Sequence, residues 1–187
     1  MDADLVVRAR RGDQRAFEML AADAYPRLYR LAHGILRDGA KADDATQQAL
    51  VSIWRNLPRL RQPSRFEGWC CRLLVNACHD QVRRAPRWTS VATLPRSAEP
   101  VAHDDISPVA DHDALERALG RVSFDQRTVL ALRFLLDRTP EEIAETLSIP
   151  RKTVYSRLQR GVASMRAAME AEIRPVMSGA ASGEAVR

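Results

Sequence analysis

The segment TPEEIAETLSIPRKTVYSRLQRG, residues 139–161, carries the pattern of two short helices joined by a tight turn. Thr139 is suited to be an N-cap, Pro140 follows at the first helical position, and Glu142 stands at the third. This combination is a strong helix start, because the cap oxygen and the glutamate satisfy backbone N–H groups that the first turn leaves unpaired. The first helix is therefore predicted to begin here and to run to Leu147.

After a turn at Ser148 and Ile149, Pro150 is predicted to open a second helix that continues through Met169. Ala144 is small enough to let the two helices cross closely, as a helix-turn-helix requires. The side chains expected to pack inward are Ile143, Ala144, Leu147, Ile149, Val154 and Leu158. The exposed face of the second helix would present Arg151, Lys152, Tyr155, Ser156, Arg157 and Arg160, and such a face can read base edges in a major groove. The alternative is a solvated basic face on an ordinary helical hairpin, which the capped turn pattern makes less favoured.

The rest of the chain also reads as helical. Ser123 and Gln126 mark the start of a helix before the helix-turn-helix. In the N-terminal half, Asp13 is predicted to cap a helix over residues 14–36, and an apolar stripe predicts another that ends before Pro58. A further helix is predicted to begin at Ser64 with a capping box that uses Glu67. No segment alternates with the period of a strand, so the fold class is predicted to be all-α.

The helix after Ser64 carries a second polar face. Arg72, Asn76, His79 and Arg83 recur at helical spacing opposite an apolar stripe, and Arg65 lies two turns earlier on the same side. Cations and amides beside an aromatic-bearing loop can hold phosphates and an unstacked base. Most such stripes are solvent faces, so this signal is weaker than that of the helix-turn-helix.

Charge divides the 187 residues into three parts. The net charge of +5 separates into +6 for residues 1–90, −4 for residues 91–113 and +3 for residues 114–187. The acidic middle part is rich in proline and small residues and poor in large apolar ones, so it is predicted to be a flexible linker between two basic helical domains. Only Lys41 and Lys152 are lysines among 29 basic residues. This arginine bias suits phosphate and guanine contacts, although a GC-rich genome would produce it as well.

The same composition argues against several other classes of protein. Three cysteines, Cys70, Cys71 and Cys78, make an odd set without zinc-ligand spacing, so neither a disulfide framework nor a metal site is expected. The start of the chain lacks the apolar run of a signal peptide, and no stretch is long and apolar enough for a membrane span. The sequence contains no paired carboxylates, no nucleophile with a histidine and no phosphate-binding glycine loop, so an enzyme is not expected and no cofactor is predicted. Asp104 and Asp105 cluster with a histidine, but only in the linker.

Three segments resemble the extracytoplasmic-function (ECF, group IV) sigma factors of bacterial RNA polymerase. DLVVRARRGDQRAFEML is similar to the opening helices of that family, and residues 42–84 are similar to its region 2. Residues 118–161 resemble its region 4. The order, the spacing and the acidic linker agree with the family over residues 3–86 and 113–170. The resemblance implies a region 2 domain at 1–88, a linker at 89–112, a region 4 domain at 113–172 and a disordered tail at 173–187.

The resemblance also implies three sets of site residues. The signature that docks on the β′ coiled coil of core polymerase would be Asp44, Ala45, Thr46, Gln47 and Gln48, expected to be exposed opposite Ile53 and Trp54. Recognition and melting of the minus-10 element would use Arg65, Phe66, Arg72, Asn76, His79, Asp80 and Arg83. The minus-35 element would be read by Arg151, Lys152, Thr153, Tyr155, Ser156, Arg157 and Arg160. The chain departs from the residues common in the family at four of these or neighbouring positions. Gln48 and Val75 affect individual docking and minus-10 contacts, and Lys152 and Tyr155 affect which promoter sequence is preferred.

The partners implied are core RNA polymerase, through its β and β′ subunits, and promoter DNA, in the cytoplasm of a bacterium. An anti-sigma protein, which holds many members inactive, is a further candidate partner, whereas a membrane or a small-molecule substrate is not expected. The alternative functions are a stand-alone helix-turn-helix regulator that does not engage core polymerase, and a sigma-like relic whose docking face no longer works. The docking signature favours the sigma factor.

Overall fold

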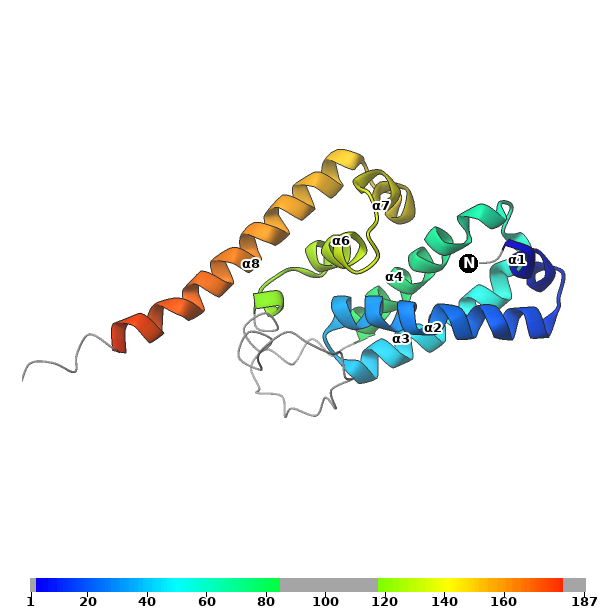
Figure 1. The fold of residues 1–187 in the computed structure, drawn as a ribbon, viewed down its shortest axis with the longest axis horizontal. Helices are drawn as coiled ribbons and strands as arrows, with labels where there is room; N and C mark the ends of the chain where they lie inside the picture. Colours follow the sequence, from blue (N-terminus) through cyan, green and yellow to red (C-terminus); the bar gives the residue numbers. More distant parts are fainter. Residues whose placement is uncertain (1–2, 85–117, 180–187) are drawn as a thin grey trace, which may run out of the picture.

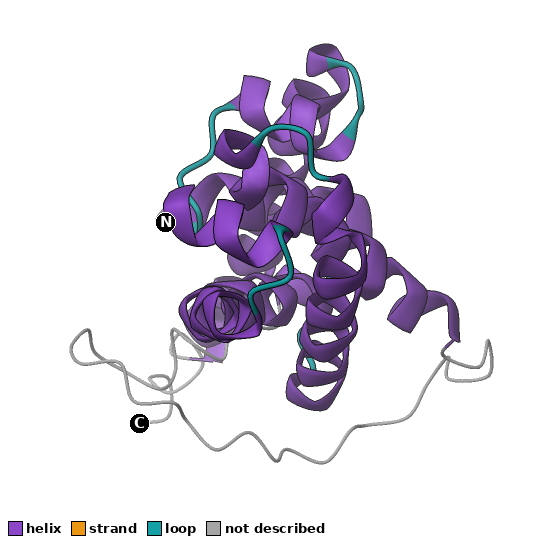
Figure 2. Cartoon of the chain, turned by 90° about the vertical axis from the view of Figure 1, so that its right-hand side faces the viewer, coloured by secondary structure: helices purple, strands orange, loops and turns teal. Residues whose placement is uncertain are grey.

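The computed structural model describes residues 3–84 and 118–179, and within these ranges it consists of helices and connecting loops (Figure 2). The first unit, residues 3–84, holds α1 (Ala3–Arg10), α2 (Gln14–Leu36), α3 (Gly39–Asn56), two 3-10 turns (Leu57–Arg59 and Pro63–Arg65) and α4 (Phe66–Arg84). The second unit, residues 118–179, holds α6 (Phe124–Phe134), α7 (Pro140–Leu147) and α8 (Arg151–Gly179). The predicted all-α fold is confirmed, while the predicted linker lies outside the described residues.

Residues with apolar side chains at helical spacing hold the first unit together. α2, α3 and α4 pack side by side, and α1 crosses the N-terminal part of α2 (Figure 1). Leu20, Leu31, Ile53 and Leu74 are among the fully buried side chains at the centre. The burial of one stripe on each helix leaves the opposite faces of α3 and α4 available to solvent or to partners.

Three helix caps that the sequence predicted are present in the structure. The side chain of Asp13 accepts a hydrogen bond from the Ala16 amide, 3.0 Å away. Ser123 with Gln126 and Thr139 with Glu142 both form complete capping boxes. These caps define the starts of α2, α6 and α7, and so they place the helix-turn-helix.

Two predicted helix boundaries were wrong. Ser64 lies inside the 3-10 turn Pro63–Arg65 instead of capping a helix, and α4 begins at Phe66, because Pro63 starts the tighter turn first. The last helix continues past Met169 to Gly179, in spite of Pro175. The predicted disordered tail therefore overlaps α8, and residues 180–187 lie outside the described residues.

Removal of the Thr139 cap will destabilise the second unit. Thr139→Ala leaves the amide of Glu142 without its side-chain acceptor, 3.2 Å away in the structure. We expect the free energy of unfolding to fall by about 0.5–2 kcal/mol, measured by urea titration with circular dichroism. Thr139→Ser keeps the hydroxyl and should remain near the parent, so an equal loss in both variants would contradict the assigned role of the cap.

Candidate functional site

The helix-turn-helix is formed by α7, a turn at Ser148–Pro150, and the start of α8. Ser148 adopts the left-handed conformation, with φ of 53°, and its amide donates to the carbonyls that end α7. The amide of Ile149 also donates to the Ala144 carbonyl, at 3.1 Å. Ile143 and Val154 are fully buried between the two helices. The predicted turn is therefore confirmed, and it directs the first turns of α8 outward.

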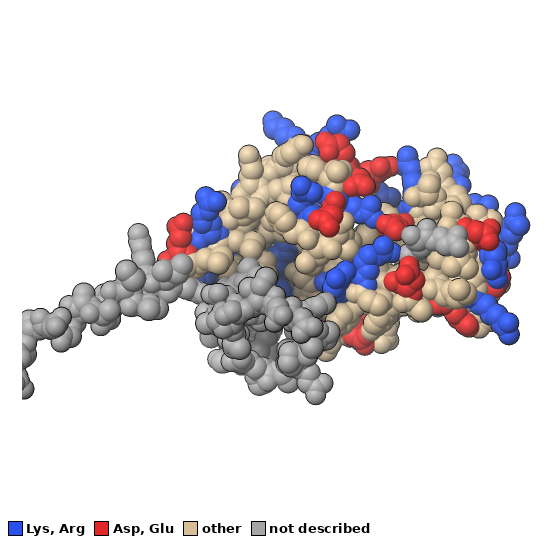
Figure 3. Space-filling model, in the orientation of Figure 1, with Lys and Arg blue, Asp and Glu red and all other residues tan. Residues whose placement is uncertain are grey.

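The outward face of α8 carries the predicted minus-35 residues. Arg151, Lys152, Tyr155 and Arg160 are exposed, whereas Thr153, Ser156 and Arg157 are partly buried. Arg157 donates to Asp125 of α6 at 2.5 Å, and Arg151 lies 3.7 Å from Glu141 of α7. Arg160 bonds to Ser156 one turn earlier. Basic and acidic side chains are interspersed in the same way over the rest of the face that Figure 3 shows. Two of the arginines already have carboxylate partners, which DNA phosphates would have to replace.

The predicted minus-10 residues lie along α4 and the turn before it. Arg65, Arg72, Asn76, His79, Asp80 and Arg83 are exposed. Phe66 was predicted to belong to the same face, but it is only 3% exposed and packs against Trp69, with ring centroids 6.1 Å apart. Phe66 is therefore a core residue of the first unit, because it falls on the stripe of α4 that packs inward, one turn before Cys70.

The predicted docking residues on α3 divide between surface and core. Asp44 and Gln47 are exposed and Gln48 is partly exposed, but Ala45 and Thr46 are completely buried. Their predicted exposure was wrong, since at helical spacing they fall on the stripe that packs inward; the Thr46 hydroxyl donates to the Ala42 carbonyl at 2.7 Å. Trp54, which was expected on the inward side, is 41% exposed. Ala45 and Thr46 therefore anchor the helix whose other face offers Asp44 and Gln47.

A polar residue next to this face is held by neighbouring side chains. Asp43 accepts hydrogen bonds from the Tyr25 hydroxyl of α2, at 2.5 Å, and from the Gln47 amide, at 2.8 Å. The hydrogen bond to Asp43 raises the pKa of Tyr25 to about 12. The contacts fix the orientation of the Gln47 side chain on the exposed surface of α3.

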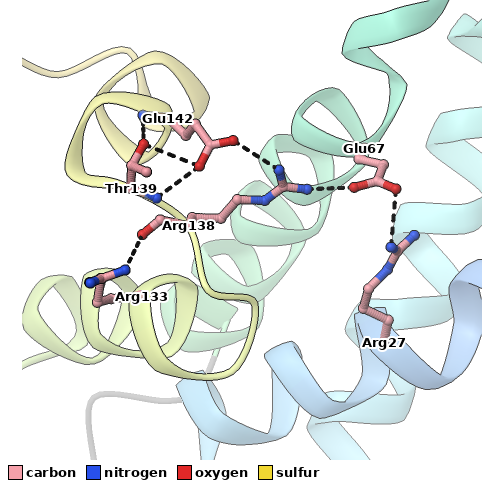
Figure 4. A network of polar contacts seen from close by, with 6 residues as sticks. All are labelled: Arg27, Glu67, Arg133, Arg138, Thr139 and Glu142. Carbon is pink, nitrogen blue, oxygen red and sulfur yellow. Dashed lines mark hydrogen bonds and ion pairs between the residues drawn. The ribbon is translucent and has the colours of Figure 1, made fainter.

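A polar network that the sequence analysis missed joins the two units. The Glu67 network consists of Arg27 on α2, Glu67 on α4, and Arg138 and Glu142 at the start of the helix-turn-helix (Figure 4). Glu67 lies 3.2 Å from Arg27 and 2.6 Å from Arg138, which also reaches Glu142 at 3.2 Å. Partial burial would raise the pKa of Glu67, but the hydrogen bond from Arg138 and the charges of Arg27 and Arg138 outweigh it, so this pKa lies below its ordinary value.

The three cysteines are buried in α4. Burial raises the pKa of Cys70, Cys71 and Cys78, to about 11 for Cys71 and about 12 for Cys78. Their thiolate fraction at neutral pH is therefore very small, and the thiols act as apolar core groups. The residues that the structure describes contain no group of three or more side chains placed to hold a metal ion. None of the described helices combines the length and the apolar character needed to cross a membrane.

Comparison with known families and proteins agrees with this arrangement. The model of sigma-70 region 2 matches residues 20–87, and the model of sigma-70 region 4 matches residues 112–165. The ECF RNA polymerase sigma factor SigM of Mycobacterium tuberculosis is 32% identical, over 88% of this chain and 82% of the relative. The RNA polymerase sigma-H factor of Pseudomonas aeruginosa is 28% identical, over 94% of this chain and 95% of the relative.

Solved structures share the fold. The structure of CnrH in complex with the cytosolic domain of CnrY matches with a TM-score of 0.68 and 24% identity, over 91% of this chain and 97% of that one. The sigma factor RpoE from Bartonella quintana, in complex with the anti-sigma factor NepR, matches with a TM-score of 0.69 and 21% identity, over 82% of this chain and 96% of that one. The family models and the curated relatives show that the chain belongs to the ECF sigma factors of the sigma-70 family, which bind core RNA polymerase and direct transcription initiation at promoters.

Proposed function

We propose that three faces of the chain carry the three binding functions of a sigma factor. The exposed side of α3, with Asp44, Gln47 and Gln48, docks on the β′ subunit of core polymerase. α4 and the turn before it read and melt the minus-10 element, and the start of α8 reads the minus-35 element while region 4 contacts the β subunit. The functional domains are residues 1–88 and 113–172, and the chain works in the cytoplasm.

One observation favours docking over a stand-alone regulator. Asp44 and Gln47 are exposed on a helix whose Ala45 and Thr46 are completely buried, and Asp43 holds the Gln47 side chain in place, so the first unit presents an ordered polar face to solvent. A regulator that binds DNA alone has no need for such a face. The proposal assigns no catalytic residue to the chain, because the chemistry of RNA synthesis belongs to the polymerase.

One of the two solved structures named above suggests a further partner. It holds a sigma factor with an anti-sigma factor. We include a protein inhibitor of this kind among the proposed partners, together with the β and β′ subunits.

Reconstituted transcription tests the proposed function. Purified chain added to core polymerase should yield run-off transcripts that start at defined promoters, and sequencing these transcripts would identify the two promoter elements. Sequence-specific DNA binding without any such transcript would instead support a stand-alone regulator or a relic with an inactive docking face.

Replacement of Asp44 should weaken core binding selectively. Asp44→Ala removes an exposed carboxylate from α3, and we expect binding to core polymerase to lose about 1–2 kcal/mol. The affinity can be measured by titrating labelled chain with polymerase. Asp23→Ala, at an exposed acidic position on α2, serves as the matched control and should bind like the parent. Equal losses in both variants, or a parallel loss of minus-35 DNA binding by the Asp44 variant, would contradict the assignment.

A further inference from the structure

A chain of hydrogen bonds runs from α2 to the exposed side of α3. The hydroxyl of Tyr25, on α2, donates to Oδ1 of Asp43 at 2.5 Å, and the side-chain amide of Gln47 donates to Oδ2 of the same carboxylate at 2.8 Å. Tyr25 and Asp43 are partly buried, whereas Gln47 is exposed. One carboxylate therefore connects a side chain of α2 to a side chain of α3 that faces solvent.

The two donors leave the Asp43 carboxylate little freedom to turn. Each of its oxygens accepts one hydrogen bond, so a turn away from this orientation breaks the bond to Tyr25 or the bond to Gln47. The Tyr25 ring stacks on Tyr29, one turn further along α2, with ring centroids 6.2 Å apart. The hydrogen bond to Asp43 and partial burial raise the pKa of Tyr25 to about 12. The Tyr25 hydroxyl therefore keeps its proton and remains a donor over the whole neutral range of pH.

The Asp43 carboxylate also decides which end of the Gln47 amide is turned toward it. A side-chain amide has a nitrogen that donates and an oxygen that accepts, while a carboxylate can only accept. The Gln47 nitrogen therefore points at Asp43, and the Gln47 carbonyl oxygen is directed away from it. Asp44 is exposed three residues before Gln47, so its carboxylate lies on the same side of α3. The groups offered to a partner here are thus two hydrogen-bond acceptors.

We propose that Tyr25 is a positioning residue for core docking, which acts through Asp43 to hold the Gln47 carbonyl oxygen ready to accept from N–H donors of the polymerase. The inference rests on the proposed function, because it takes Gln47 as part of the docking face. A glutamine side chain has several rotatable bonds, and ordering it on binding costs part of the affinity. A side chain that is already ordered in the free chain avoids this cost. Tyr25 therefore contributes to the affinity for polymerase through two intervening side chains.

A double-mutant cycle on the full chain tests whether Tyr25 acts through Gln47. Tyr25→Phe removes the hydroxyl and keeps the ring, and we expect binding to core polymerase to weaken by about three- to tenfold, as the loss of one hydrogen bond would do. Gln47→Ala should weaken binding at least as much. The variant with both changes should bind no more weakly than Gln47→Ala alone. Losses that multiply would show that Tyr25 and Gln47 act independently, and they would overturn the proposal.

Tyr29→Phe is the matched control for the loss of a tyrosine hydroxyl from α2. Tyr29 is also partly buried, but its hydroxyl lies near the start of α3, 3.4 Å from the position that a Cβ atom on Gly39 would occupy. We expect this variant to bind polymerase like the parent. Urea titration with circular dichroism shows whether each variant keeps its fold. A loss at Tyr29 equal to that at Tyr25 would contradict a specific role of the Tyr25 hydroxyl.

An exchange of the two polar side chains of α3 gives a sharper test. Asp43→Asn can still accept from Tyr25, but it turns an amide nitrogen toward Gln47 and should reverse the Gln47 amide. Gln47→Glu places two carboxylates side by side. Each single variant should therefore bind polymerase about three- to tenfold more weakly than the parent.

The variant that combines Asp43→Asn with Gln47→Glu should recover binding. Its amide donates to the new carboxylate at position 47, whose other oxygen again faces outward as an acceptor. The combined variant has the same net charge as the parent, and we expect its affinity to return to within about threefold of the parent value. If it bound as weakly as the single variants, the orientation of the acceptor at position 47 would not matter and the proposal would fail.

Nuclear magnetic resonance of the free chain separates this inference from the proposed function. The side-chain amide signals of Gln47, assigned by their loss in Gln47→Ala, should shift in Tyr25→Phe and exchange faster with water, while Tyr29→Phe leaves them unchanged. Unchanged Gln47 signals in Tyr25→Phe would overturn the positioning role whatever the polymerase binding. If the parent did not bind polymerase at all, the proposed function would fail, whereas the Gln47 signals would still show whether Tyr25 orders this side chain.

Discussion

Replacement of Ile53 by alanine will lower the free energy of unfolding by about 2–5 kcal/mol, because it removes buried methyl and methylene groups and leaves a cavity. Ile53 is 1% exposed at the point where α3 packs in the core of the first unit. Urea titration followed by circular dichroism measures the change. The loss should also reduce transcription near the unfolding temperature, since α3 carries the proposed docking face.

Val51 provides the matched control for this prediction. It is also β-branched and lies two residues away on the same helix, but it is 48% exposed. Val51→Ala should change stability by no more than about 0.5 kcal/mol. Similar losses at the two positions would mean that the packing of α3 differs from that in the structure.

Replacement of Arg157 by alanine will weaken binding to minus-35 duplex DNA by about 1–3 kcal/mol if the side chain makes a bidentate contact to a base. Arg157 lies near the start of α8, partly buried at the edge of the exposed face, where its pairing with Asp125 of α6 fixes the position of its guanidinium group. Fluorescence anisotropy with the parent promoter and with single base changes measures both affinity and specificity.

The pattern across promoter sequences decides the type of contact. Loss of discrimination at one base pair supports a base contact, whereas equal weakening on every sequence would reassign Arg157 to a phosphate. Arg166→Ala is the control, because Arg166 is exposed further along α8, beyond the turns that would enter the groove. A comparable loss at Arg166 would contradict the placement of the recognition face.

Local features could be predicted from the sequence. Asp13, Ser123 and Thr139 act within three residues of the amides that they cap, so the pattern alone located the helix starts. The inward stripe of the helix-turn-helix was equally readable, since Ile143 and Val154 follow helical spacing.

Features that depend on tertiary packing could not be predicted in the same way. Ala45, Thr46 and Phe66 were assigned to binding faces through the resemblance, but the stripe that faces the core buries them. Glu67 was expected to cap its own helix, whereas two arginines from other helices bind its carboxylate. A capping motif indicates only which local hydrogen bond can form. It contains no information on the arginines from other helices that the fold brings close to the same carboxylate.

The salt bridge between Glu67 and Arg138 also limits how this chain can be recombined with others. A chimaera that takes residues 118–179 from a relative would keep Glu67 and Arg27 in the first unit but could lose the cation at position 138. Glu67 would then keep Arg27 but lose its bond across the boundary, and the two halves would be mismatched even if each folds well. Compatible parents for such a chimaera are therefore those that carry a carboxylate at position 67 and a cation at position 138, because only then is the ion pair between the two units kept.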